Sequence, residues 1–234
     1  MPTSIWIPDW PPQQAGADDD EFADAAGAGV PTGWTEVDHG AVQTVSEDEL
    51  GLKLLQSTHA GDQFTGIYKA IPTGPFTIWT KMSISGLAET NYIMGGLALW
   101  QDATSSSGDL YNLRVQCDAT SVSFNVERWS SYTTWESTVV ARTFSVDAFP
   151  THMYLRVRRD ATPTYSWDVS SDGIAWAQLA SATIGITPVH YGPCMDNNAT
   201  GADVNVRFKF FRYLASDVGL DGLVKGDRVN MSIF

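Results

Sequence analysis

The sequence predicts an all-β fold in which two antiparallel sheets pack face to face, preceded by an extended N-terminal arm. Three observations predict it. Short runs rich in Val, Ile, Thr, Phe, Tyr and Trp recur from Trp34 onward, separated by turn-forming residues. Several of these runs alternate polar and apolar side chains, as half-buried strands do. No run has the length and period of a convincing amphipathic helix.

Residues 1–33 differ in composition from the rest of the chain and are assigned to an arm and a connector. Residues 1–12 contain four prolines around the apolar residues Ile5, Trp6, Ile7 and Trp10. Because proline lacks an N–H and restricts its neighbour, we expect an extended arm that does not fold by itself. The two tryptophans would anchor the arm in a partner's groove, or the arm folds back on its own domain. Residues 15–33 are rich in Ala, Gly and acid, which is typical of a flexible connector.

The predicted strands then follow through residues 34–216. The clearest are Gly51–Gln56, Phe64–Ile71, Phe76–Ile84, Ile93–Gln101, Tyr111–Cys117, Ser121–Trp129, Thr134–Ala141, Met153–Arg159, Tyr165–Ser170, Trp176–Leu179 and Val204–Tyr213. Alternating strands of this kind are typical of antiparallel sheets, and about a dozen without helices pack as a β-sandwich or jelly roll. Residues 217–234 form a tail or a last edge strand.

The strand Phe76–Ile84 shows the alternation most clearly. Phe76, Ile78, Met82 and Ile84 share one face, which we expect to be the buried one. The opposite face carries Thr77, Lys81 and Ser83 and one large aromatic residue, Trp79.

Charge and composition exclude several classes of function. The formal net charge is −13, whereas proteins that bind phosphate backbones present basic patches. No apolar stretch approaches the roughly 20 residues that span a bilayer, and the N-terminus lacks the pattern of a signal peptide. We therefore expect no nucleic-acid binding, no membrane insertion and no Sec export. Residues 1–62 hold 12 acids and one base, Lys53, so an acidic attachment segment precedes a nearly neutral sandwich.

The two cysteines, Cys117 and Cys194, lie far apart and form no CxxC motif. Without clustered histidines they cannot build a structural zinc site by themselves. Two buried free thiols are favoured over a disulfide, which remains the alternative.

Several stretches resemble modules of the concanavalin A-like lectin/glucanase superfamily. Gly61–Ile71, Pro75–Ile78 and Met94–Trp100 are similar to the front sheet of these jelly rolls, in which the glycines of a "GGLxL" phrase let the facing sheet approach. Tyr154–Arg159 and Tyr165–Trp176 are similar to the signature "L-R-hydrophobic-R... Y... S-x-D-G-x-x-W" of the same modules.

The physical basis of this signature is a turn. Ser171–Gly173 would supply a hairpin turn with Gly173 at positive φ, and Trp176 is expected to cover the core. The resemblance covers roughly residues 34–213 and implies the fold, because this one fold hosts lectins, hydrolases and structural modules.

A second resemblance concerns the opening of the domain. Asp18–Phe22, followed by Gly33 and Trp34, resembles the first strand of sandwich modules in bacteriophage tail, fibre and head-decoration proteins. It implies a virion protein assembled in the host cytoplasm, with other virion proteins and further copies of itself as partners.

Catalysis is not expected. Glucanases of this superfamily use a strand motif E-x-D-x-x-E, and its nearest match, Glu36–Ala41, lacks the third carboxylate. A retaining mechanism needs a second carboxyl about 5 to 5.5 Å from the nucleophile. Glu47–Glu49 does not restore the spacing and is interpreted as a solvated turn. Serine-hydrolase, zinc-protease and phosphate-loop motifs are absent from the sequence.

Carbohydrate binding is the more plausible chemistry, because sugars stack one apolar face on exposed aromatic rings. The candidate contacts are the hairpin residues Trp129, Tyr132 and Trp135, together with Trp100 and Trp79. Alternatively, these side chains fill the core.

A structural calcium ion is a second candidate. Asp18, Asp20 and Glu21 would have to meet Asp196 to supply the oxygen ligands that calcium requires. A hydrated acidic linker is the alternative. No other cofactor is expected.

Two functional hypotheses result. The first is a non-catalytic virion structural or adhesion protein, part of a capsid decoration, fibre or tail, that docks by its arm and displays a lectin-like sandwich, with a host-surface glycan as a possible ligand. The second is a carbohydrate-binding module or degenerate glycoside hydrolase that acts outside the cell.

Overall fold

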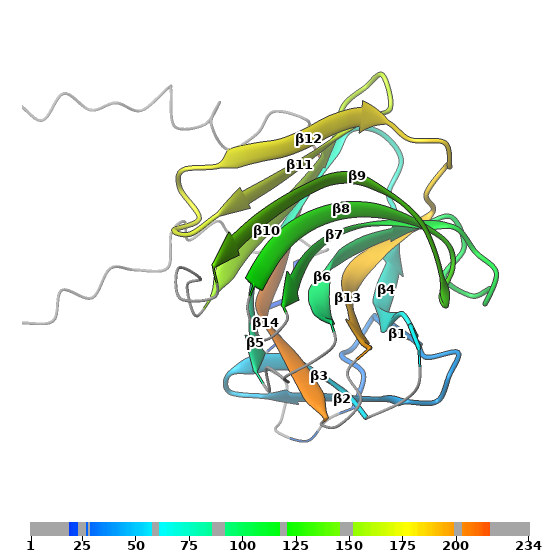
Figure 1. Cartoon of the computed structure of the whole chain (residues 1–234), viewed down its shortest axis with the longest axis vertical. Coiled ribbons are helices and arrows are strands. Elements are labelled where there is room, and N and C mark those ends of the chain that lie inside the picture. Colours follow the sequence, from blue (N-terminus) through cyan, green and yellow to red (C-terminus); the bar gives the residue numbers. More distant parts are fainter. Residues whose placement is uncertain are drawn as a thin grey trace, which may run out of the picture.

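The predicted all-β sandwich is confirmed by the structure, a computed structural model (Figure 1). It describes residues 19–22, 27, 29–57, 61–85, 92–117, 121–145, 152–198 and 203–215. These residues form two seven-stranded antiparallel sheets and contain no helix that could cross a membrane. The arm residues Ile5, Trp6, Ile7 and Trp10, and the tail 217–234, lie outside the described residues.

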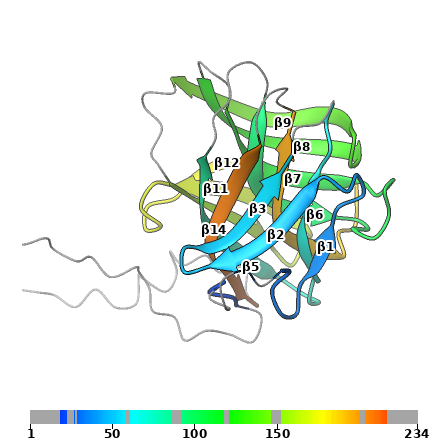
Figure 2. The same cartoon turned by 90° about the horizontal axis from the view of Figure 1, so that it is seen from below.

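The two sheets form two layers, as Figures 1 and 2 show. The sheet called the front sheet here has the order β1 (Thr35–Val37), β4 (Thr65–Ala70), β13 (His190–Asn197), β6 (Ile93–Trp100), β7 (Leu110–Cys117), β8 (Ser121–Ser131) and β9 (Thr134–Ser145). The back sheet has the order β12 (Ala177–Thr183), β11 (Thr164–Ser170), β10 (Met153–Arg159), β5 (Phe76–Ser85), β14 (Val204–Leu214), β3 (Gly51–Gln56) and β2 (Gln43–Asp48).

The main core lies between the sheets, but the front sheet is also buried on its outer face. The predicted inward residues Phe76, Ile78 and Met82 all belong to the main core. A second apolar cluster lies on the outer face of the front sheet and consists of Val37, Phe64, Ala98, Trp100, Ala103, Leu110, Trp129 and Cys194. Every residue of β6 is buried as a result. Cys117 and Cys194 form no disulfide, and each is buried in a different one of the two clusters.

The sheets pack tightly where β6 carries glycine. A Cβ atom added to Gly95 would lie 2.6 Å from Cγ1 of Val206, which belongs to β14 of the back sheet. This is below any normal van der Waals separation. The expectation that the "GGLxL" phrase allows the facing sheet to approach is therefore confirmed at Gly95.

The turn at Ser171–Gly173 also forms as predicted. Gly173 has a φ of 74°, and its N–H donates to Oγ of Ser170 at 2.8 Å. Trp176 does not cover the core, however. It lies on the outer face of the back sheet, with its ring centroid 4.2 Å from Cζ of Arg156. Because Leu155 points into the core, its neighbour Arg156 must point outward, and Trp176 covers that side chain.

Residues 19–22, which their composition assigns to the connector, pack against the sandwich. Asp20 forms an isolated antiparallel bridge with Phe211 of β14. Its Oδ2 accepts a 2.7 Å hydrogen bond from Nε1 of Trp34, and the ring of Phe22 lies 5.8 Å from that of Trp34. Phe22 is almost completely buried, so these residues contribute to the core of the sandwich.

Three strands, β1, β2 and β13, were not among those predicted. Glu47, interpreted as part of a solvated turn, lies in β2 opposite Leu52 and is only 1% exposed. β13 contains Gly192 and Pro193, which disfavour strands, yet it lies between β4 and β6. Its register with β4 skips these two residues, so the missing N–H of Pro193 falls where that ladder is interrupted.

Replacing Gly95 with Ala should lower the free energy of unfolding by about 1 to 3 kcal/mol, because the new methyl group collides with Val206. Chemical denaturation measures this change. The matched control is Gly185→Ala, where an added Cβ has no neighbour within 4 Å and the cost should be small. Val206→Ala should relieve the collision, so the double variant should lose less stability than the two single changes together. Simple additivity would show that the sheets do not meet there.

Candidate ligand-binding site

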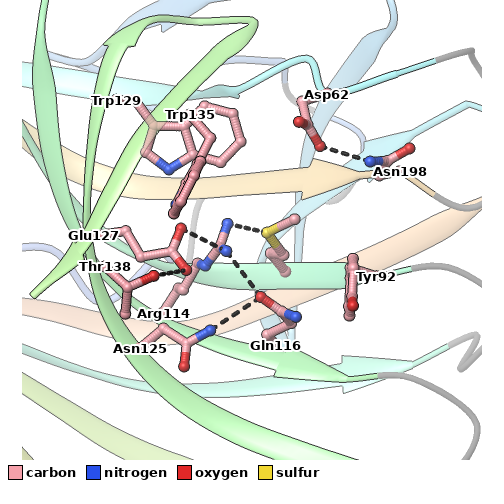
Figure 3. A pocket seen from close by; sticks show the side chains of 11 residues that line it. Asp62, Tyr92, Arg114, Gln116, Asn125, Glu127, Trp129, Trp135, Thr138 and Asn198 are labelled. Atoms are coloured by element: carbon pink, nitrogen blue, oxygen red, sulfur yellow. Dashed lines mark hydrogen bonds and ion pairs between the residues drawn. The ribbon is translucent and has the colours of Figure 1, made fainter. Parts of the chain in front are cut away.

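A pocket of about 450 Å³ opens on the outer face of the front sheet (Figure 3). It lies across β6, β7, β8 and β9, beside the chain segments that contain Asp62 and Asn198. Its lining residues combine aromatic, polar and charged side chains: Asp62, Tyr92, Met94, Arg114, Gln116, Asn125, Glu127, Trp129, Trp135, Thr138 and Asn198. Its size is typical of small-ligand sites, and its lining is more polar than is usual for them.

The polar floor of the pocket is a product of strand alternation. On β7, Leu113 and Val115 point into the main core, so Arg114 and Gln116 point outward. On β8, Val126 points inward, while Asn125 and Glu127 line the pocket. Neighbouring strands therefore place four polar side chains side by side on one face.

An ion pair between Arg114 and Glu127 organises this floor. Nη2 of Arg114 lies 2.6 Å from Oε2 of Glu127, and both side chains are about 4% exposed. The same Nη2 donates to Oε1 of Gln116 at 2.8 Å, and Nδ2 of Asn125 donates to that oxygen at 3.0 Å. Nη1 of Arg114 also contacts the sulfur of Met94. These contacts hold the floor in one arrangement (Figure 3).

The electrostatics of the ion pair reflect its burial. Burial raises the pKa of the Glu127 carboxyl, and the positive charge of Arg114 opposes that rise. Oγ1 of Thr138 donates to Oε1 of Glu127 at 3.4 Å. A buried pair of this kind is costly to break, because the remaining partner would be an uncompensated charge.

Two tryptophans that face each other across β8 and β9 occupy one side of the pocket. Trp129 is 1% exposed, and its ring packs 5.4 Å from that of Phe64 and 5.5 Å from Cζ of Arg114. Its partner in the β8–β9 register, Trp135, is 50% exposed. Tyr92, 46% exposed, lies on the opposite side of the pocket (Figure 3). The pocket therefore has exposed aromatic rings on both sides.

A pair of acidic residues lies at the edge nearest β13. Oδ1 of Asp62 accepts a 2.7 Å hydrogen bond from Nδ2 of Asn198, and Oδ1 of Asp196 accepts one of 2.9 Å from the N–H of Gln63. Asp196 is fully buried. Burial, together with the negative charge of Asp62, raises the pKa of Asp196 to about 7, although Arg114 opposes the rise.

The structure brings some of the sequence-predicted aromatic residues together and separates others. Trp129 and Trp135 share the pocket, whereas Tyr132 lies at the tip of their hairpin, 5.3 Å from the ring of His39. Trp100 is buried in the second apolar cluster. Trp79 belongs to β5 of the back sheet and is 4% exposed, opposite Arg156 of β10.

The charged floor of the pocket was not predicted from the sequence. Arg114, Gln116, Asn125 and Glu127 occupy alternate positions of two consecutive predicted strands. That alternation and the short connection between the strands were usable signals, because they place these polar residues on one face of a hairpin. What no local pattern showed was that Asp62 and Asn198, from distant segments, would border this face.

The proposed calcium ligands do not come together. Asp20 and Glu21 contact the back sheet through Phe211 and Arg212, whereas Asp196 lies on the front sheet, and Asp18 falls outside the described residues. Within the described part of the chain, no group of three or more His, Cys, Asp or Glu side chains is placed to hold a metal ion.

The carboxylates of the glucanase-like stretch have structural partners. Asp38 accepts hydrogen bonds from the N–H groups of Val42 and Gln43, and Glu36 accepts one from the side chain of Gln43.

No protein family matches the chain, and no curated protein matches it significantly in sequence. Solved structures share its fold at low identity. A mutant of the GH43 protein BlXynB from Bacillus licheniformis is 14% identical, with a TM-score of 0.60 over 92% of this chain and 41% of that one. The CBM2 module of the evolved Dit of Lactobacillus casei BL23 phage J-1 is 9% identical, with a TM-score of 0.53 over 85% of this chain and 95% of the module. The carbohydrate recognition domain of Emp47p is also 9% identical, with a TM-score of 0.51 over 83% of this chain and 92% of that domain.

These likenesses confirm the predicted jelly-roll sandwich fold. The chain spans about two fifths of the length of the GH43 protein BlXynB and of a second, engineered GH43 glycoside hydrolase with the same fold.

The raised pKa of Asp196 makes stability depend on pH. Its carboxyl holds a proton in the folded state up to about pH 7 but loses it near pH 3.8 when unfolded, so stability falls as pH rises between these values. The amide side chain introduced by Asp196→Asn cannot ionise, so this substitution should remove the loss. The stability of the variant relative to the wild type should therefore increase as pH rises from about 4.5 to about 8. Thermal unfolding across this range measures the gain, with Glu36→Gln as the exposed control. Parallel curves for wild type and Asp196→Asn would contradict the prediction.

Proposed function

We propose that the chain is a non-catalytic carbohydrate-binding sandwich that holds a saccharide in the front-sheet pocket. The observation that carries this proposal is Trp135, a half-exposed indole opposite Tyr92 and beside a hydrogen-bonding floor. A sugar ring offers an apolar face for stacking and a rim of hydroxyls for polar groups. The pocket supplies both kinds of contact. The fold likeness to a CBM2 module and to a carbohydrate recognition domain supports the same proposal.

The absence of catalysis is part of the proposal. Glu127 is 3% exposed and paired with Arg114, which leaves it poorly placed to attack a sugar carbon or to protonate a leaving group. Asp62 is held by Asn198 at the edge of the pocket. The GH43 likeness favours a glycoside hydrolase as the alternative, so hydrolysis is measured together with binding.

We further propose that the sandwich is a module of a virion, in which the arm around Trp6 and Trp10 docks on a structural partner. The specific observation in its favour is the likeness to the module of a phage Dit, which extends over nearly that whole module. On this proposal the sandwich is the displayed part and the pocket contacts host-surface glycan. A carbohydrate-binding module that acts outside the cell is the alternative.

Trp135→Ala should reduce glycan binding at least ten-fold while leaving stability nearly unchanged, because the side chain is half exposed. A glycan array followed by titration calorimetry with the best ligand measures this. Val139→Ala on the same strand is the matched control, since Val139 is similarly exposed and does not line the pocket. Trp129→Ala is unsuitable, because removing a buried tryptophan costs about 3 to 5 kcal/mol. Equal binding by Trp135→Ala and wild type would refute the site, and release of reducing ends would refute the non-catalytic role.

Deleting residues 1–14 should abolish incorporation into particles while glycan binding by the purified protein is retained. The measurement is the amount of full-length and truncated protein that co-sediments with gradient-purified virions. Incorporation of the truncated protein would disprove docking by the arm. If the full-length protein is also missing from the particles, the virion role is wrong and the extracellular alternative is favoured.

A further inference from the structure

We propose that the pocket selects saccharides that carry an ammonium group, such as glucosamine units, over neutral or acidic sugars. This inference rests on the proposed glycan-binding function and names the chemical class of its ligand. It is drawn from the charges, the unpartnered polar atoms and the aromatic rings of the pocket.

The charge balance of the pocket favours a cation. Among the described residues that line it, Arg114 is the only cation, and its charge is met by Glu127 at 2.6 Å. Asp62 also lines the pocket, and its carboxylate has no cation of its own within salt-bridge distance in the described part of the chain. A positively charged group in the pocket would therefore find negative charge that the protein leaves uncompensated.

The hydrogen-bonding groups of the pocket also favour a ligand that donates hydrogen bonds. Asn125 is 5% exposed and lines the pocket, yet its Oδ1 accepts no hydrogen bond from the described residues. This atom is an acceptor, and leaving it unsatisfied costs free energy that a ligand donor would recover. On the donor side, Nε of Arg114 has no partner among the described residues, while the Trp129 side chain lies against the Glu127 carboxylate.

An anionic ligand does not fit this arrangement. Recognition of a carboxylate or phosphate usually requires a guanidinium or ammonium group with free donors. The Arg114 guanidinium is 4% exposed and already engaged by Glu127, Gln116 and Met94. A uronic acid would thus meet the negative charge of Asp62 without a free cation to offset it.

The aromatic rings complete the recognition of a cation. An ammonium group is attracted to the face of an aromatic ring, and indole is the strongest such partner. Trp135 and Tyr92 stand exposed on opposite sides of the pocket, with Asp62 near Asn198 at its rim (Figure 3). Tyr92 directly precedes β6, whereas Trp135 lies on β9, three strands away and level with the other end of β6. A ligand of more than one sugar unit can contact both.

The test compares three trisaccharides by titration calorimetry with the full chain at pH 6.5 and low salt. The probes are β-1,4-linked glucosamine, its N-acetylated form and a galacturonate trimer. The first two share one backbone and differ only at the nitrogen, which is a protonated amine in the first and a neutral acetamide in the second. We expect the glucosamine trimer to bind at least ten-fold tighter than the N-acetylated trimer, and the galacturonate trimer not to bind. The preference should shrink in 0.5 M NaCl, where charges are screened.

Two variants distinguish the effect of the pocket on binding from the effect of the protein's overall negative charge. Asp62→Asn should reduce the preference for glucosamine at least three-fold, because it removes a carboxylate from the pocket. Glu36→Gln changes the net charge by the same amount at an exposed position of β1 and should leave the preference intact. Equal losses in both variants would show non-specific attraction and overturn the inference.

The remaining outcomes show separately whether the inferred ligand class is wrong and whether the proposed glycan-binding function is wrong. If the array yields a neutral or acidic glycan whose binding depends on Trp135, and glucosamine has no advantage, the inference is wrong and the glycan-binding function stands. If no glycan binds at all, both are wrong.

Discussion

The central strands of the front sheet have to bury both of their faces, and most of the architecture follows from this constraint. One face packs on the back sheet and the other carries the second apolar cluster, so β6 has no exposed residue and β13 is nearly as buried. Strands in this position cannot present large side chains on both sides without separating the layers. Gly95 meets this requirement on the inner face, where Val206 of the back sheet leaves no room for a side chain.

The outer face divides into an apolar half and a polar half, and the boundary between them is the ligand-binding site. Trp129 belongs to both halves, because it packs on Phe64 on one side and lies over Arg114 on the other. The polar half is held by the ion pair between Arg114 and Glu127. Because both partners are buried, they are restricted to a few orientations, and the floor of the pocket is organised before any ligand arrives.

Most strands could be predicted because polar and apolar residues alternate along them, as in Phe76–Ser85. β13 could not, since Gly192 and Pro193 disfavour strands and only its two neighbours hold it in the sheet. The same limit applies to Trp129 and Trp135. Their sequence spacing indicated a hairpin, and that hairpin forms, but it did not show that one ring would be buried and the other half exposed.

The sequence alone determined the fold class, the turn at Gly173 and the aromatic hairpin, because these depend on local periodicity and on backbone preferences. Only the tertiary structure decided the order of the strands, and with it which polar residues become neighbours. Arg114 and Glu127 lie 13 positions apart, while Asp62 and Asp196 are separated by 134. Sheet pairing brings these pairs together, and burial then sets their pKa values. No local pattern encodes such contacts, because their energy arises only when distant strands are packed side by side.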